Sequence, residues 1–430
     1  MTFGEFISLH EGDDPVRLLL SRGRYPEMDM DLVASTLQVR ARLRTKVPEW
    51  YGVPSLKFPS RLSGEQCSSA ETARYKATVA QAVLAQGLGT ASAALRPLPS
   101  QAMGPSLLHG RGWPWVPKPC TGTGRIADLT GGLGVDSWAF SEVAEEVLYN
   151  EMQTPLMEAV RDNFRELGVE NVVFRSREVA PGSVAEVLGG FSPDLIYLDP
   201  ARRSPDGRKV FRLEDCSPEI LPLLPELFCF SRYILLKLSP MADLTLLKRQ
   251  IPAVRDIHVV AAEGECKELL FLLERDAVGE PRLIVRDGGA VLEIPAEEQA
   301  LRLAGRSEVG GCLFEPGKAL AKAGAFALPC RYGLKKLGVN THLYSAPEPV
   351  EALRPFGKWF ALEEVCHLDK RTLRDLGRRY PQAEVTARNI SLSSEELRRR
   401  IGCGSGGGVH LFGARLDDGP EQLVLVLRRL

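Results

Sequence analysis

A glycine-rich turn between a short apolar run and a helical pattern constrains the fold of this chain more than any other segment. Residues 126–137 read IADLTGGLGVDS and carry glycines at positions 131, 132 and 134. Because glycine lacks a Cβ, the backbone can turn sharply there and approach a ligand closely. Open α/β sheets bind cofactors at turns that follow the carboxyl ends of their strands. The stretch therefore predicts the first strand of such a sheet, although three glycines also occur in plain strand-to-helix turns.

Short apolar runs alternate with amphipathic helical patterns from about residue 119 to residue 275. This rhythm is typical of βαβ units and predicts a doubly wound, mostly parallel sheet, so the expected fold class is α/β with a Rossmann-like core. The expected strands occupy residues 126–129, 147–149, 172–174, 195–198, 233–238, 257–261 and 269–273.

The segments on either side of this sheet follow other patterns. Residues 1–118 carry apolar residues at helical spacing and predict an all-α N-terminal domain that ends in a proline-rich connector at 112–119. Residues 276–345 and 346–430 mix short strands with helices and predict two small α+β domains. The stretch 331–430 holds seventeen Lys and Arg against twelve Asp and Glu, so it is the basic end of the chain.

Composition excludes several classes of protein. The 54 Lys and Arg nearly balance the 55 Asp and Glu, so a nucleic-acid surface would have to be a local patch. The nine cysteines form no CxxC pair and the histidines show no HExxH spacing, so we expect no metal site and no disulfide scaffold. The chain lacks a signal-like start and any 18-residue apolar run, which predicts a reduced, soluble, cytoplasmic protein without a membrane span.

Two acids near the glycine turn indicate which cofactor it binds. Glu151 lies 23 residues after Asp128, at the end of the next apolar run, where a carboxylate can accept both ribose hydroxyls of an adenosine. A dinucleotide fingerprint that starts at Gly132 would need Gly or Ala in place of Ser137, and Asp136 would bring negative charge toward its pyrophosphate. Asp128 instead suits a ligand that carries an ammonium group, as S-adenosylmethionine does.

The fourth expected strand ends in a second acid motif, Asp199-Pro200. Proline fixes the backbone, so Asp199 can face the cleft, accept a hydrogen bond from an amine and orient its lone pair toward a methyl group. An Asx turn before proline is the plain structural alternative. Arg202 and Arg203 follow, either as ligands of substrate phosphates or as solvated loop charges.

Together these motifs resemble a known enzyme family. DLTGGLGVDS, Glu151 and DPARR look like class I S-adenosylmethionine-dependent methyltransferases. The strings at 65–77, 315–326, 334–344 and 386–401 resemble the bacterial methyltransferases with a C-terminal THUMP-like domain. The resemblance implies a helical domain at 1–118 and a Rossmann-like domain at 119–275 whose last strand is antiparallel. It further implies a ferredoxin-like domain at 276–345, a THUMP-like domain at 346–430 and a role in RNA methylation.

The resemblance also assigns roles to individual residues. Glu151 would hold the ribose, Glu178 the adenine, and Asp199 with Pro200 would form the transfer site. Ala201 and Arg202 stand where enzymes that methylate amino groups often have an aromatic residue, so a base nitrogen is only moderately favoured as acceptor. Carbon-5 of uridine is disfavoured, because 236–240 holds no cysteine nucleophile. The residues expected to line the methionine end are Asp128, Thr130, Gly131, Gly132 and Gly134.

Weaker signals concern the two ends of the chain. Ser68-Ser-Ala-Glu71 fits a helical capping box, and the resemblance makes 66–69 a candidate flap over the cofactor. Arg398 and Arg399 lie late in a helical pattern, where they either complement the helix dipole or contact RNA phosphates. Two hypotheses follow: an RNA methyltransferase, or a noncatalytic RNA-binding protein that retains the methyltransferase fold.

Overall fold

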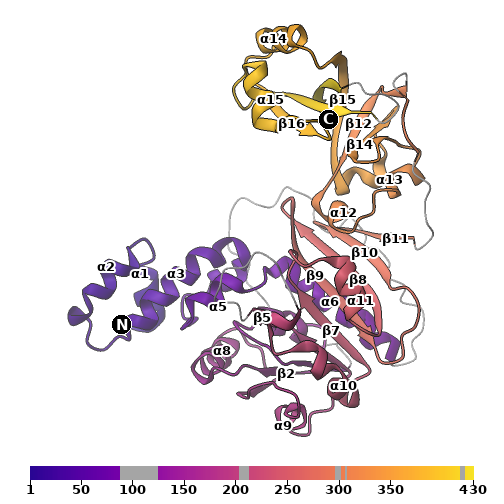
Figure 1. Cartoon of the computed structure of the whole chain (residues 1–430). Helices are drawn as coiled ribbons and strands as arrows, with labels where there is room; N and C mark the ends of the chain where they lie inside the picture. Colours follow the sequence, from indigo (N-terminus) through magenta and orange to yellow (C-terminus); the bar gives the residue numbers. More distant parts are fainter. Residues whose placement is uncertain (88–123, 203–212, 296–301, 306–307, 417–421) are drawn as a thin grey trace. The chain divides into compact units, whose positions relative to one another are not determined.

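The computed structural model of the chain describes residues 1–87, 124–202, 213–295, 302–305, 308–416 and 422–430 (Figure 1). These residues form two units. The first comprises Met1–Ile257 and Leu269–Pro281, and the second comprises His258–Glu268 and Arg282–Leu430. The expected connector at 112–119 and Arg203 lie outside the described residues.

The N-terminal region is helical, as predicted. Thr2 begins the first helix with a reciprocal capping box, because its side chain accepts from the Glu5 amide while the Glu5 carboxylate accepts from the Thr2 amide. Its helices are α1 (Phe3–Leu9), α2 (Pro15–Leu20), α3 (Met30–Lys46), α4 (Pro48–Tyr51), α5 (Arg61–Gln66) and α6 (Ala70–Gly87).

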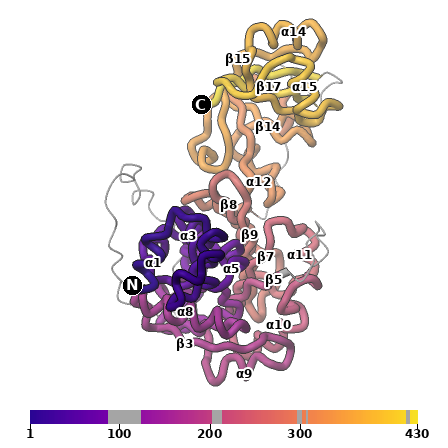
Figure 2. The backbone as a smooth tube through the Cα atoms, turned by 90° about the vertical axis from the view of Figure 1, so that its left-hand side faces the viewer, coloured from indigo at the N-terminus to yellow at the C-terminus, as the bar shows by residue number. Residues whose placement is uncertain are grey.

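This helical region packs on the sheet domain of the same unit. The Trp50 indole is fully buried and lies edge-on to Trp138 and Phe164, at centroid distances of 5.9 and 6.4 Å. The Lys57 backbone amide donates to Asn163 Oδ1 at 2.7 Å. Figure 2 shows the N-terminal helices next to the helix at 154–166, to which Asn163 belongs. The helical region and the sheet therefore share one hydrophobic core.

The central sheet has nine strands in the order β11-β10-β8-β9-β7-β4-β1-β2-β3. The strands β1, β2, β3, β4 and β7 are parallel to one another. Strand β9 runs antiparallel to β7, from Tyr233↔Glu274 to Leu238↔Leu269. The predicted Rossmann-like sheet and its antiparallel last strand are confirmed. The strands are β1 (Arg125–Asp128), β2 (Glu146–Asn150), β3 (Val172–Arg175), β4 (Leu195–Leu198), β7 (Tyr233–Leu238), β8 (Val254–Ala262), β9 (Glu265–Glu274), β10 (Arg282–Asp287) and β11 (Ala290–Ile294).

The strand order creates a switch point between β1 and β4. From β1 the chain adds β2 and β3 on one side, then returns to place β4 on the other side. Ligands bind open α/β sheets at the carboxyl ends of such strands, and the glycine turn and Asp199 follow β1 and β4 there. The connecting helices are α7 (Val135–Ser141), α8 (Thr154–Glu166), α9 (Val184–Leu188), α10 (Ile220–Phe230) and α11 (Leu244–Gln250).

A second sheet of seven strands dominates the C-terminal part of the chain, in the order β13-β14-β12-β15-β18-β17-β16. Strands β12 and β15 pair from Cys312↔Ala361 to Pro316↔Gly357, so the segments on both sides of residue 345 share this sheet. The strands are β12 (Cys312–Pro316), β13 (Lys335–Gly338), β14 (Thr341–Ala346), β15 (Gly357–His367), β16 (Glu384–Arg388), β17 (Val409–Arg415) and β18 (Gln422–Arg429). The α-helices of this part are α12 (Lys318–Lys322), α13 (Leu328–Arg331), α14 (Lys370–Arg379) and α15 (Ser394–Ile401). None of the helices in the described ranges has the length and apolar character needed to cross a bilayer.

Candidate active site

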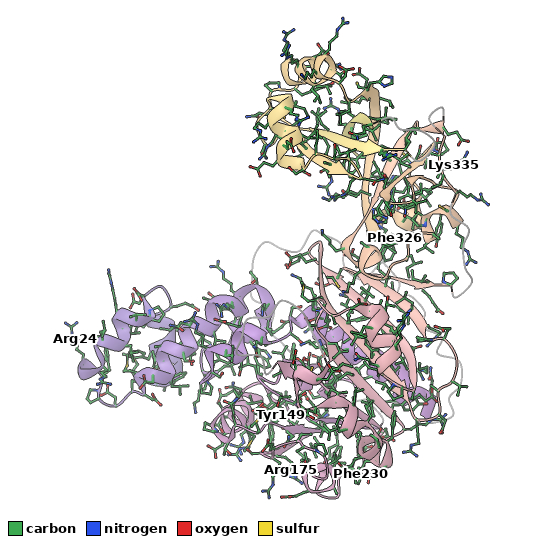
Figure 3. All side chains as sticks on the ribbon, viewed as in Figure 1. Arg24, Tyr149, Arg175, Phe230, Phe326 and Lys335 are labelled. Carbon is green, nitrogen blue, oxygen red and sulfur yellow. The ribbon has the colours of Figure 1, made fainter. Side chains whose placement is uncertain are left out.

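The three glycines of the turn have different surroundings. A Cβ on Gly131 would lie 2.2 Å from Cε2 of Tyr149, the ring labelled in Figure 3, and one on Gly134 would lie 2.8 Å from Cγ1 of Val160. A Cβ on Gly132 would meet only the Thr130 carbonyl oxygen, at 3.9 Å. Close packing therefore requires Gly131 and Gly134, whereas Gly132 borders open space.

Asp128 ends β1 and is fully buried under the turn. Its carboxylate accepts from the Thr130 amide at 3.1 Å and from Ser137 Oγ at 2.5 Å. Burial raises the pKa of this carboxyl to about 7, against the Ser137 hydrogen bond, and the charge of Asp136 adds to the rise. Among the described residues no cationic side chain pairs with Asp128, so a cationic ligand would be its counterion.

The end of β2 anchors the same turn. The Glu151 side chain accepts from the Gly132 amide at 3.1 Å with one oxygen and from the Gln153 amide at 2.9 Å with the other. The buried side-chain amide of Asn150 donates to the backbone carbonyl oxygens of Leu129 and Arg177, at 3.1 and 2.9 Å. Asn150 was not among the predicted site residues, although a polar residue at the end of an apolar strand was the available signal.

Asp199 follows β4 and lies against the glycine turn. Its amide donates to Thr130 Oγ1 at 2.7 Å, and its carboxylate forms an ion pair with Lys237 of β7. Lys237 was not among the predicted site residues, although it lies in the stretch 236–240 that lacks a cysteine. Its signal was a lone charge in the otherwise apolar strand YILLKL. Asp128, Thr130, Glu151 and Asp199 thus surround one turn.

The other predicted residues lie away from this cluster or outside the description. Glu178 is exposed in the loop after β3, and its described contact is a backbone one, with its carbonyl accepting from Ser183 Oγ. Arg202 pairs with Cys216 in a short two-stranded ladder of β5 (Ala201–Arg202) and β6 (Cys216–Ser217). Arg398 and Arg399 lie on α15, in the second unit, where the Arg398 guanidinium donates to Ser405 Oγ. In the described ranges no cluster of His, Cys, Asp and Glu is suited to hold a metal ion.

The fold and these contacts define a class of enzyme. A Rossmann-like sheet with an antiparallel strand next to β7, a glycine turn at the switch point and acids at the carboxyl ends of β1, β2 and β4 are the features of class I methyltransferases.

Comparisons with known proteins agree with this class. A family model described as "THUMP domain-like" matches residues 357–429, and one described as "ferredoxin-like domain" matches residues 313–353. A crystal structure of a "putative methyltransferase" from Porphyromonas gingivalis W83 is similar at 30% identity and a TM-score of 0.79, covering 99% of this chain and 97% of that one. An uncharacterised S-adenosylmethionine-dependent methyltransferase of Mycobacterium tuberculosis is 26% identical over 290 residues, 65% of this chain and 74% of the relative.

The chain belongs to the family of bacterial class I S-adenosylmethionine-dependent methyltransferases with a C-terminal THUMP-like domain. Its cofactor is therefore S-adenosylmethionine. The predicted domain limits at 118, 275 and 345 stay predictions.

Proposed function

We propose that this methyltransferase modifies a structured RNA, with a base nitrogen as the favoured acceptor, and that Asp199 orients that nitrogen. The observation that carries the proposal is the position of Asp199, whose amide is bonded to Thr130 of the glycine turn at 2.7 Å. An acceptor held by its carboxylate would lie next to the donor turn. The THUMP-like match at 357–429 supports RNA as the substrate, because THUMP modules are associated with structured RNA.

The residues around the turn fit the cofactor. The space beside Gly132 is open, and the buried Asp128 carboxylate has no cationic partner among the described residues, so it would bind the ammonium group. Each Glu151 oxygen accepts one backbone amide and retains a lone pair for a ribose hydroxyl. Gly131 and Gly134 give the turn its shape, Thr130 connects it to Asp199, and Glu178 is the proposed contact of the adenine. Bound S-adenosylmethionine supplies an electrophilic methyl group on its sulfonium.

On the acceptor side, the residues of the chain position the acceptor nitrogen rather than activate it. Lys237 holds one oxygen of Asp199, which leaves the rest of the carboxylate to accept a hydrogen bond from the acceptor N–H. That bond directs the nitrogen lone pair, and Pro200 fixes the backbone beside it. Little base strength is required, because orientation supplies a large part of the acceleration in such a transfer.

The proposed role of Asp128 predicts a pH dependence of cofactor binding. Below a pKa of about 7 the carboxyl is protonated and neutral, so it attracts an ammonium group less than the carboxylate does. We expect the affinity for S-adenosylhomocysteine, which has the same amino-acid end, to rise up to about tenfold from pH 6 to pH 7.5. Calorimetric titration measures it. An Asp128→Asn variant should bind weakly and without this pH dependence; a persisting dependence would remove Asp128 from the donor site.

The proposed RNA contacts predict a salt dependence. Arg202, Arg203, Arg398 and Arg399 are the proposed phosphate ligands, and α14 adds five basic residues against one acidic residue. Replacing Arg398 and Arg399 together by alanine should weaken binding to total bacterial RNA and lower the slope of log K against log salt by about 1 to 2. Filter binding between about 50 and 200 mM KCl measures it. Arg400→Ala is the matched control, since Glu396 already pairs with Arg400 at 2.7 Å.

Incubation with radiolabelled S-adenosylmethionine and total RNA from a strain that lacks the gene tests the function. We expect label in RNA, in nucleosides that carry the methyl group on a base nitrogen. RNA that binds to the protein but stays unlabelled would favour the noncatalytic alternative. Label in protein alone would exclude RNA as the substrate.

A further inference from the structure

A fully buried lysine from the N-terminal helices reaches the active site. Lys76 belongs to α6, and its side chain is 0% exposed. Its ammonium lies 3.2 Å from Asp136 Oδ1 and donates to Ser68 Oγ at 3.1 Å. Burial of a charged ammonium is costly unless it is paired and hydrogen-bonded, so this lysine depends on Asp136.

Asp136 connects three parts of the site. It lies in the first turn of α7, directly after the glycine turn. Its Oδ2 accepts from Ser68 Oγ at 3.0 Å and from the Tyr197 hydroxyl at 2.8 Å. Tyr197 is on β4, two residues before Asp199. One carboxylate therefore joins the N-terminal helices, the helix after the donor turn and the strand that carries the acceptor acid.

Charges around Asp136 link it to Asp128. Burial would raise the pKa of Asp136, but Lys76, Lys237 and the Tyr197 hydrogen bond together hold that pKa below its usual range, so the group is ionised. Burial raises the pKa of Asp128 most, and the charge of Asp136, with a smaller contribution from Asp199, adds to that rise. Among the described residues, Tyr197 donates to Asp136 and the partly buried Cys67 thiol also lies near Asp136, while Tyr149 lies close enough to Asp128 to feel its charge.

We propose that Lys76 is a positioning residue of the methyl-donor site and acts through Asp136. The ammonium holds the Asp136 carboxylate against Tyr197 and the first turn of α7, and it offsets the negative charge that Asp136 directs at Asp128. The N-terminal helical region is thus a working part of the donor site rather than a separate module. This inference rests on the proposed role of Asp128. It also gives a function to Ser68, which lies in the candidate flap at 66–69.

The midpoint of the pH dependence of S-adenosylhomocysteine binding tests the proposal in the full chain. In Lys76→Met, where Lys237 and the Tyr197 hydroxyl still favour the ionised form of Asp136, its charge is no longer offset by Lys76, so the midpoint should move up by about 0.5 to 1 pH unit relative to the wild type. The double variant Lys76→Met/Asp136→Asn removes both charges with little change in volume, and its midpoint should move below the wild-type value. Lys57→Met is the matched control, because Lys57 forms a partly exposed pair with Asp162 of α8, and its midpoint should not move.

The outcomes separate the possible failures. If Lys76→Met does not fold, the double variant decides, with its folding checked by circular dichroism. If Lys76 has a purely structural role, both Lys76 variants should be less stable but keep the wild-type midpoint. When Asp128→Asn has lost the pH dependence, that result would overturn this inference and leave the proposed donor site intact. If Asp128→Asn retains the dependence, the assignment of the donor site and this inference both fail.

Discussion

Replacing Asp199 by alanine is expected to lower the rate of methyl transfer to RNA by at least about 100-fold while cofactor binding changes little. Asp199 lies beside the donor turn through one backbone contact, its amide on Thr130 Oγ1, and the substitution preserves that amide. What it removes is the carboxylate that pairs with Lys237 and is proposed to orient the acceptor. Initial rates of label transfer to RNA and calorimetry with S-adenosylhomocysteine measure the two effects.

Two further variants sharpen this test. Asp199→Asn keeps an oxygen that can accept the acceptor N–H but loses the charge that Lys237 neutralises, so its rate should lie between those of wild type and Asp199→Ala. Asp162→Ala removes a surface carboxylate of α8 that pairs with Lys57 and should change neither quantity. A normal transfer rate in Asp199→Ala would exclude Asp199 from the mechanism.

Local signals explain why much of the fold could be predicted. The expected strands at 195–198 and 233–238 coincide with β4 and β7, because continuous apolar runs bounded by polar turns are typical of buried parallel strands. The helical pattern in which Arg398 and Arg399 were expected to lie late coincides with α15. Ser393 caps its beginning by accepting from the Glu396 amide, and Gly402 ends it at a φ of +81°.

Partners distant in sequence explain what could not be predicted. Lys237 meets Asp199 across 38 residues, and Ser68 meets Asp136 across 68 residues. Nothing in the local pattern around Lys76 distinguishes a buried ion pair from a solvated helical lysine. The shared sheet of β12 and β15 is likewise a product of pairing between separate segments, which the sequence rhythm of 276–430 does not show.

The glycine turn combines both situations. Its position at the end of the first strand could be predicted from the sequence, but the sequence pattern does not distinguish the roles of its three glycines. In the structure Gly131 packs against the ring of Tyr149, and Gly134 packs against Val160 and Phe164 of α8. Only the tertiary fold brings these side chains next to the turn. A side chain at either position would clash with the core and destabilise the protein before it affected a ligand. Gly132 is therefore the informative position for a test of the cofactor site.

Gly132→Val is expected to weaken S-adenosylhomocysteine binding by about 100-fold or more, because the new side chain would fill the open space beside the turn. It also places a β-branched residue at a φ of +52°, a strain of about 1 to 2 kcal/mol in the left-handed region. Gly190→Val controls for that strain, since Gly190 has a φ of +85° and an equally open Cβ position in the loop before β4. Both variants should unfold at lower temperature than the wild type, but only Gly132→Val should fail to titrate in calorimetry. Equal affinities in the two variants would mean that the cofactor does not bind beside Gly132.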